Sequence, residues 1–148
     1  MIFNDWNETF WLGSLTIAIC LLQELNLAGT QLKTLPDGLF TSGKLRFLDL
    51  HDNRLMDVPA SLQNAVQLRE LNLNANPIRR LNAASFTGLT SLVKLEISMM
   101  SHLQHIEGNS FTPLRNLETL ECSQNYQLRS IHPNAFTNVT TLKEVPLL

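Results

Sequence analysis

Leucines and polar residues alternate in short runs that recur along most of the chain. Each run follows the pattern L-x-x-L-x-L, and most close with asparagine or a polar substitute and then a further apolar residue, as in LRELNLNANPI. The first leucines of the runs are Leu22, Leu45, Leu68, Leu92, Leu117 and Leu142. They are 23, 23, 24, 25 and 25 residues apart. Spacing this regular indicates an internal structural repeat.

Each run predicts one short strand with its leucines on a single face, because successive residues of a strand point to opposite sides. Two further apolar positions recur between the runs. The first falls 13 or 14 residues into each repeat, at Leu35, Val58, Leu81, Ile106 and Ile131. The second falls five or six residues before the next run, at Phe40, Leu62, Phe86, Phe111 and Phe136. A single repeat cannot cover these side chains, so we expect the repeats to stack into a parallel sheet.

The asparagine that closes a run is predicted to be structural. After the strand the backbone turns inward, and each unpaired buried N–H or C=O group costs about 1 kcal/mol or more. An inward amide supplies both donors and an acceptor, so we expect a ladder of Asn53, Asn76 and Asn125, with Thr30 as a weaker substitute. Met100 takes this position in the fourth repeat. We therefore expect an irregular turn there, or an adaptable apolar contact that Met99 and Met100 offer to a partner.

These repeats closely resemble the leucine-rich repeat family. The resemblance implies an α/β leucine-rich repeat solenoid, with a curved parallel β-sheet on the concave side and turns and short 3₁₀ segments on the convex side. Prolines 36, 59, 113 and 133 favour such short segments over full helices. The recurrent phenylalanine and the period look most like extracellular animal members. We divide the chain into a hydrophobic N-terminal segment or cap, residues 1–21, and five repeats with the start of a sixth, residues 22–148.

The N-terminal segment leaves the cellular location open. Residues 10–22 are apolar, which suits a signal peptide or an anchor, but Asp5 and Glu8 precede them where a signal would be basic. The alternative is a segment that packs over the first repeat. Asn7 in NET and Asn138 in NVT match the glycosylation motif. We expect a secreted protein or the ectodomain of a membrane protein, with a cytoplasmic protein as the alternative.

Composition and charge argue against several function classes. The formal net charge of -2 over 148 residues, with no cluster of lysine and arginine, gives no support for nucleic-acid binding. Cys20 and Cys122 lack the number and spacing of a disulfide framework or a metal site. His102, His105 and His132 have no further ligands to complete a metal site. We therefore expect neither a metal nor a cofactor.

His51 beside Asp49 and Asp52 superficially suggests a hydrolase. Ser98 lies in the same column of the predicted sheet but two strands away, roughly 10 Å, which is too far for direct proton transfer. We therefore expect no enzyme. The resemblance to leucine-rich repeat proteins implies instead a recognition module that binds a protein ligand on the concave face, in extracellular ligand binding, adhesion or innate immune recognition. The alternative is a structural or assembly fragment of a longer receptor without a ligand site of its own.

The outward strand positions define the candidate ligand-binding residues, which are Arg46, Phe47, Asp49, His51, Arg69, Glu70, Asn72, Lys94, Glu96, Glu118 and Glu121. Acceptor side chains fill one column across the strands, at Asn26, Asp49, Asn72, Glu96 and Glu121. Its two glutamates are expected about 4.8 Å apart and should repel by roughly 1 kcal/mol, a cost that a purely structural surface need not carry. With Phe47 as an apolar anchor, this column predicts a basic ligand. The alternative is a merely solvated sheet. Asn74 takes an outward position, unlike the ladder asparagines, and is expected to add little to stability.

The C-terminal end of the array is the last candidate surface. Leu142, Val145 and Leu147 would face inward in a sixth strand, and no capping sequence follows them. An uncapped solenoid exposes a sheet edge together with apolar side chains. The sequence therefore predicts possible self-association through residues 142–148.

Overall fold

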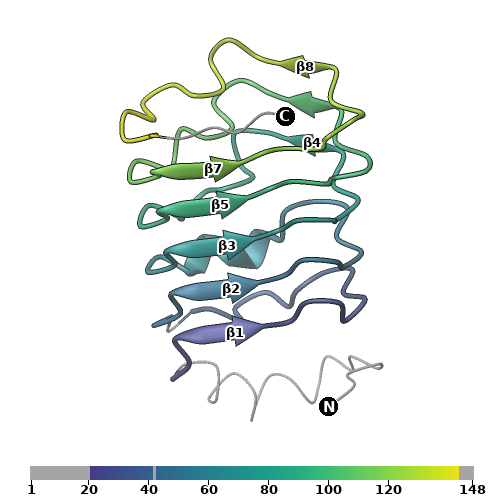
Figure 1. Cartoon of the computed structure of the whole chain (residues 1–148). Helices are drawn as coiled ribbons and strands as arrows, with labels where there is room; N and C mark the ends of the chain where they lie inside the picture. The colour runs from purple at the N-terminus through teal and green to yellow at the C-terminus, as the bar shows by residue number, and fades with distance from the viewer. Residues whose placement is uncertain (1–20, 42, 144–148) are drawn as a thin grey trace.

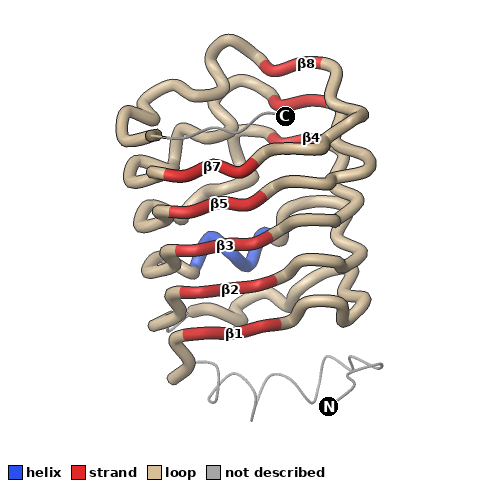
Figure 2. Tube along the Cα trace, viewed as in Figure 1, coloured by secondary structure: helices blue, strands red, loops and turns tan. Residues whose placement is uncertain are grey.

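The chain forms a coil of stacked repeats, described here by a computed structural model for residues 21–41 and 43–143. Each repeat contributes one strand to a five-stranded parallel sheet (Figures 1 and 2). Its strands, in spatial order, are β1 (Glu24–Asn26), β2 (Phe47–Asp49), β3 (Glu70–Asn72), β5 (Lys94–Glu96) and β7 (Thr119–Glu121). The predicted leucine-rich repeat solenoid is confirmed.

The leucine at the centre of each strand sets the register of this sheet. Leu25, Leu48, Leu71, Leu95 and Leu120 pair in sequence across the five strands. All but Leu25 are at most 1% exposed, because the neighbouring repeats cover both sides of each side chain. The residues before and after each central leucine point away from the core and form the opposite face.

A second parallel sheet, which the sequence did not predict, follows the turn after the main strands. It contains β4 (Arg80–Leu81), β6 (His105–Ile106) and β8 (Ser130–Ile131). The sheet is extended by bonds from the amide of Glu107 to the carbonyl of Leu81, 2.9 Å, and from the amide of His132 to that of Ile106, 2.8 Å.

Proline explains why this sheet begins only in the third repeat. The residues that correspond to Glu107 and His132 in the first two repeats are Pro36 and Pro59. Proline has no N–H to donate, so Pro59 cannot make the bond to the preceding repeat. Pro59 instead precedes the 3₁₀ helix η2 (Ala60–Asn64), which agrees with the expected short segments.

Phenylalanines form a stack on the far side of the core. The ring centroids of Phe86 and Phe111 are 5.7 Å apart, those of Phe111 and Phe136 are 4.8 Å apart, and both pairs stack with planes 15° from parallel. Ile131 differs from the expected inward position, since it is 38% exposed. Its strand, β8, is the last strand of its sheet in the described part of the chain, so no neighbour covers it.

Asparagines bond successive turns together inside the coil. The Asn76 side-chain Nδ2 donates to the carbonyls of Leu50 and Leu73 at 2.9 and 3.0 Å, and its Oδ1 accepts from the amide of Leu55 at 3.1 Å. Asn53 makes the equivalent three bonds one repeat earlier. The Thr30 hydroxyl donates to the carbonyl of Leu27 at 2.7 Å and lies 3.2 Å from the Asn53 Oδ1.

The expectation of an irregular turn around Met100 is wrong. Met99 has a φ of 56°, the same as Ala75 one repeat earlier, and its amide bonds to the next repeat at 3.0 Å, as that of Ala75 does. Met100 is fully buried and cannot take part in the suggested contact to a partner, whereas Met99 is 49% exposed, so that the contact stays a prediction for Met99 alone. The carbonyls on either side of it accept bonds from other asparagines, Leu73 from Asn76 and Ile97 from Asn125. Each of these two carbonyls thus keeps one asparagine donor.

Several expectations concern residues outside the described ranges. These are the apolar segment up to residue 20, the sequon at Asn7, and residues 144–148 of the sixth run. The described part does reach Lys143, whose amide donates to the Glu118 carbonyl at 2.8 Å. This bond continues the backbone hydrogen bonding between repeats beyond β7. No helix within the described residues is long and apolar enough to span a membrane.

Candidate ligand-binding face

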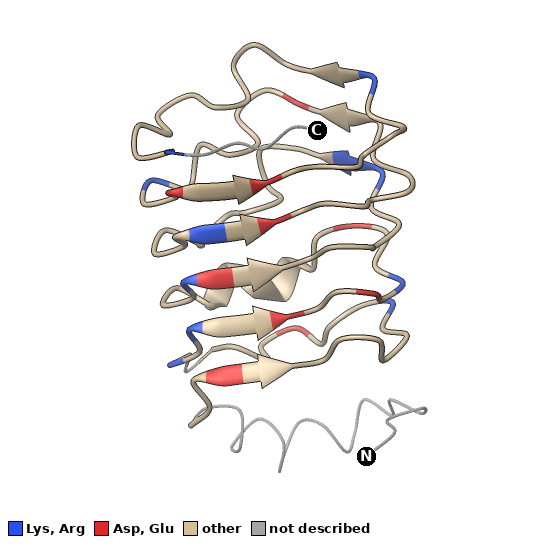
Figure 3. Cartoon of the chain, viewed as in Figure 1, with Lys and Arg blue, Asp and Glu red and all other residues tan. Residues whose placement is uncertain are grey.

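The outer face of the five-stranded sheet carries its side chains in columns that run across the strands. One column is Glu24, Phe47, Glu70, Lys94 and Thr119, and the next is Asn26, Asp49, Asn72, Glu96 and Glu121. The predicted alignment of the acceptor side chains is therefore present. Figure 3 shows the acidic residues on successive strands, with a basic residue on β5 beside them.

The two glutamates of the acceptor column share a lysine. The Lys94 Nζ lies 2.6 Å from the Glu96 Oε1 and 3.0 Å from the Glu121 Oε1. The hydrogen bond to Glu96 raises the pKa of Lys94 above its ordinary value, burial lowers it in part, and Glu121 raises it further. The expectation that these carboxylates repel at a cost was wrong, because a cation on the neighbouring column compensates both.

The other acceptors of the column serve their own turns. The Asp49 Oδ1 accepts the amide of His51 at 3.0 Å and lies 2.8 Å from the His51 Nδ1, and Asp49 is only 8% exposed. The Oδ1 atoms of Asn26 and Asn72 likewise accept the amide two residues later, each at 2.9 Å. Most of the acceptor column thus has partners within the fold.

Side chains from β3 onward also bond across repeats. The Asn74 Nδ2 donates to the Glu96 Oε2 at 2.9 Å, and its Oδ1 accepts the amide of Ser98 at 2.6 Å. The Ser98 hydroxyl oxygen accepts the amide of Ser123 at 3.0 Å. The small contribution expected of Asn74 therefore does not fit its contacts. We call Asn74, Lys94, Glu96, Ser98 and Glu121 the bonded region.

In the described part of the chain, the outward side chains of β1, β2 and β3 themselves make no such bonds between repeats. Glu24 and Glu70 are exposed, and between them lies Phe47, which is partly buried. Within residues 21–41 and 43–143, neither glutamate takes part in an ion pair, and neither do the exposed Arg46 and Arg69. We call Glu24, Arg46, Phe47, Arg69 and Glu70 the open region.

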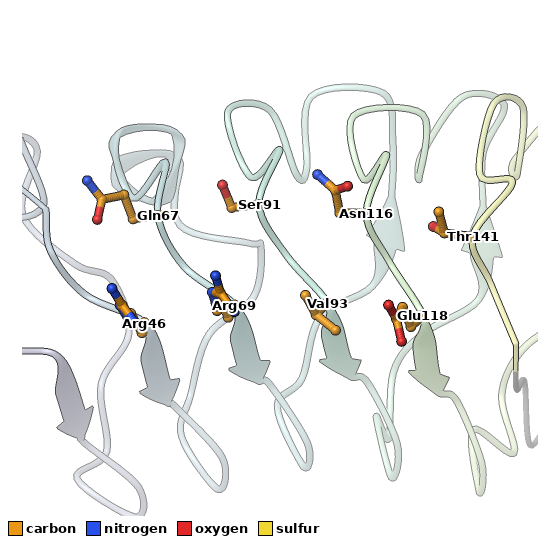
Figure 4. Close-up of a pocket in the computed structure, with 8 residues that line it drawn as sticks. All are labelled: Arg46, Gln67, Arg69, Ser91, Val93, Asn116, Glu118 and Thr141. Carbon is orange, nitrogen blue, oxygen red and sulfur yellow. The ribbon is translucent and has the colours of Figure 1, made fainter.

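A groove of about 410 Å³ runs across the starts of the strands. Two rows of side chains line it (Figure 4). One row follows the first leucine of each repeat and consists of Arg46, Arg69, Val93 and Glu118; the other precedes that leucine and consists of Gln67, Ser91, Asn116 and Thr141. The second row was missed in the sequence, although its fixed place before each first leucine could have indicated it.

The residues considered for catalysis do not form a reacting pair. His51 contacts Asp49, whereas the hydroxyl of Ser98 is engaged with Ser123 on the next repeat. Burial raises the pKa of the Cys122 thiol, which is 3% exposed, and a hydrogen bond from Asn125 lowers it in part. A neutral buried thiol is a poor nucleophile.

Two further groups of candidates can be placed. The described residues contain no group of three or more histidine, cysteine, aspartate or glutamate side chains that could hold a metal ion. His105 contacts the Ser130 hydroxyl at 2.9 Å on the three-stranded sheet, and His102 contacts Ser101. Asn138 of the second sequon is exposed, which leaves it accessible to a modifying enzyme.

Comparison with known families agrees with this architecture. Residues 20–78 match the family described as Leucine rich repeat, and residues 59–148 match the BspA type Leucine rich repeat region. The chain belongs to the leucine-rich repeat family.

The similar curated proteins are animal members of this family. Chaoptin of Drosophila melanogaster is 40% identical over 79 residues, covering 52% of this chain and 6% of chaoptin. Toll-like receptor 6 of Dasypus novemcinctus is 27% identical over 103 residues, covering 69% of this chain and 12% of the receptor. The expected likeness to extracellular animal members is confirmed, and the chain spans only a small part of these relatives.

Solved structures show the same fold. The glycosylated Toll–Spatzle complex of Drosophila matches with a TM-score of 0.76 and 26% identity, covering 86% of this chain and 17% of the matched chain. The complex of TLR13 with the RNA ssRNA13 matches with a TM-score of 0.70 and 25% identity, covering 84% of this chain and 20% of that chain.

Proposed function

We propose that this chain is a non-enzymatic recognition module that binds a protein ligand on the outer face of its five-stranded sheet. The observation that carries the proposal is the open region. There Phe47 lies between two exposed glutamates, and no bond between repeats engages these side chains in the described part of the chain. Elsewhere on the face most polar groups have partners already, so the open region is where a ligand would find unoccupied groups.

The open region also suggests the chemistry of the ligand. An aromatic side chain at the centre of an interface contributes strongly to affinity, and carboxylates on both sides favour an approaching basic surface. We therefore expect a ligand patch with an apolar centre and basic groups around it. Glu24 and Glu70 replace Glu96 and Glu121 as the carboxylates that receive it, because Lys94 already neutralises the latter pair.

The relatives support this function class and an extracellular location. The Toll structure is a complex with a second protein, Spatzle, and two relatives are named as receptors. We place the chain outside the cell, as a secreted protein or part of an ectodomain, where Asn7 and Asn138 could carry glycans.

The test uses the chain as bait against a library of secreted proteins, followed by affinity measurement on the recovered ligand. Phe47→Ala should weaken binding at least tenfold, while Val66→Ala, an apolar truncation at a residue 49% exposed off the sheet face, should change it less than twofold. Equal affinities of Phe47→Ala and the parent would show that the ligand does not use this face.

A second candidate function, assembly with another chain, has one observation in its favour. Ile131 on β8 is 38% exposed, and Tyr126 nearby in the same repeat is 86% exposed. The predicted self-association through residues 142–148 would cover the same end of the coil. Light scattering should then show a mass that rises with concentration and falls for Ile131→Glu, whereas a constant monomer mass would contradict assembly.

A further inference from the structure

Arg46 and Arg69 occupy the same position in successive repeats at the start of the groove. The amide of Arg69 donates to the carbonyl of Arg46 at 2.8 Å, and the amide of Arg46 donates to the preceding repeat at 2.7 Å. These bonds hold the two backbones at the spacing of adjacent strands, about 4.8 Å. The two guanidinium groups consequently leave the sheet side by side (Figure 4).

This pair differs from the glutamate pair on the same sheet. Glu96 and Glu121 are also one strand apart, but Lys94 lies within 3.0 Å of both. No carboxylate of the described residues pairs with Arg46 or Arg69. Glu118, which lines the same groove, is occupied by Lys143 at 2.6 Å. The two arginines therefore leave a positive charge uncompensated within the described fold.

The other groove residues can pair with a polypeptide backbone. The Asn116 Nδ2 donates to the Thr90 carbonyl at 2.7 Å, which leaves its Oδ1 as an acceptor. Gln67 is exposed and carries a side-chain amide, and Ser91 is partly exposed. Such side chains offer both donors and acceptors to peptide groups.

We propose that the groove binds an extended acidic peptide segment, with Arg46 and Arg69 each holding a carboxylate. Guanidinium groups bind carboxylates through two parallel hydrogen bonds, and this geometry suits arginine better than lysine. The groove crosses about four strand intervals, roughly 19 Å at 4.8 Å each, which corresponds to about six extended residues. The inference rests on the proposed function in that the segment would belong to the same protein ligand.

A peptide fits this groove better than a single-stranded nucleic acid does. Nucleic-acid channels combine a continuous basic track with aromatic side chains that stack on the bases. The groove has only two cations that lack a carboxylate partner among the described residues, and no aromatic residue lines it. Val93, next to Arg69, instead gives a small apolar contact.

The experiment measures fluorescence anisotropy of rhodamine-labelled hexaglutamate at low ionic strength. We expect the parent to bind hexaglutamate at least tenfold more tightly than hexaglutamine. Arg46→Gln with Arg69→Gln should remove at least tenfold of this affinity. The matched control, Arg79→Gln with Arg80→Gln, removes the same charge from another exposed arginine pair, at β4, and should change the affinity less than twofold.

A third variant tests the site without removing either arginine. Val93→Glu places a carboxylate one strand from Arg69 and should lower hexaglutamate affinity at least tenfold by occupying it. Equal losses in the two arginine pairs would overturn the proposal, since only overall charge would then matter. The proposal would also be overturned, in favour of nucleic acid, if a uridine hexanucleotide bound more tightly than hexaglutamate and this binding disappeared in the Arg46→Gln, Arg69→Gln variant.

The peptide assay is separate from the test of the proposed function. Phe47→Ala should leave hexaglutamate affinity within twofold of the parent because Phe47 does not line the groove. If the proposed function is wrong, Phe47→Ala will bind the protein ligand as tightly as the parent does, while the hexaglutamate results stay as expected. Failure of the groove would appear in the peptide assay alone.

Discussion

The bonded region and the open region lie on one sheet, in neighbouring repeats, yet they use their polar residues differently. In the bonded region Lys94 joins two glutamates, and Asn74 joins two repeats. In the open region Arg46 and Arg69 have no carboxylate partner among the described residues, and Glu24 and Glu70 no cation. Polar residues that the fold uses contribute to stability, and those it leaves unpaired are available to a ligand.

This comparison shows what charge in a sequence can indicate. Glu96 and Glu121 were expected side by side as two like charges, and that expectation about position was correct. Their energetic consequence depended on a third residue, Lys94, one column away. Like charges therefore suggest a binding site only after the surrounding partners have been counted.

The largest expected effect lies beneath both regions, in the asparagine ladder. Asn76→Ala removes the partner of three buried backbone groups and should lower the free energy of unfolding by about 1 to 3 kcal/mol. Urea denaturation measures this, with Gln127→Ala, an exposed amide, expected to cost less than about 0.5 kcal/mol. Equal losses in the two variants would contradict the structural role of the ladder.

The next effect separates the two regions directly. Asn74→Ala removes bonds to Glu96 and to the amide of Ser98 and should cost about 1 to 2 kcal/mol. Glu70→Ala, in the open region, should cost less than about 0.5 kcal/mol. The same denaturation measurement compares them, and a cost for Glu70→Ala as large as that for Asn74→Ala would remove the distinction.

Lys94→Met tests whether the cation compensates the glutamates. The variant leaves Glu96 and Glu121 facing each other, which should cost roughly 1 kcal/mol at pH 7. The double variant Lys94→Met with Glu121→Gln should recover most of this loss at pH 7. A double variant that recovers none of the loss would mean that Lys94 acts through packing alone.

The stability of the parent should depend on pH in the alkaline range through Lys94. The folded-state pKa of Lys94 is raised above its ordinary value of 10.5. Its contribution to stability is therefore complete below pH 10.5 and is lost as the pH rises through the higher folded value. Lys94→Met should lack this component of the alkaline loss when unfolding is followed by circular dichroism from pH 9 upward.

The smallest effect on stability is expected in the open region as a whole. Glu24→Gln, Arg46→Gln and Glu70→Gln combined should leave the unfolding free energy within about 0.5 kcal/mol of the parent. A substantial loss, with circular dichroism showing less folded protein, would mean that these side chains support the fold after all.

The repeat spacing was sufficient to predict the fold, because every strand needs its central leucine at the same depth. It also predicted which residues share a column, from Asn26 to Glu121. The residues that make up the groove could be predicted only in part. Gln67 and Asn116 lie outside the strand template. Their place beside Arg69 and Glu118 depends on the path of the loop that precedes each strand.

Two misses have local physical reasons. Met100 was expected to disturb its turn, but each ladder asparagine bonds to carbonyls in two repeats, so the loss of one amide leaves the flanking carbonyls Leu73 and Ile97 with donors. The three-stranded sheet was missed because the effect of Pro36 and Pro59 appears only when repeats are compared at the same position. Only the later repeats have an N–H there.

The prolines that end the three-stranded sheet also affect how the coil bends. Paired strands lie about 4.8 Å apart. The last three repeats pair in both sheets, so their spacing is the same on two sides and this part of the solenoid should curve little. In the first two repeats the second side holds proline turns and η2 and contributes no strand to the three-stranded sheet, so strand pairing does not fix the spacing there. Curvature should therefore be concentrated at the N-terminal repeats, around Phe47 and the two arginines, and a rounded ligand would fit best against that part of the face.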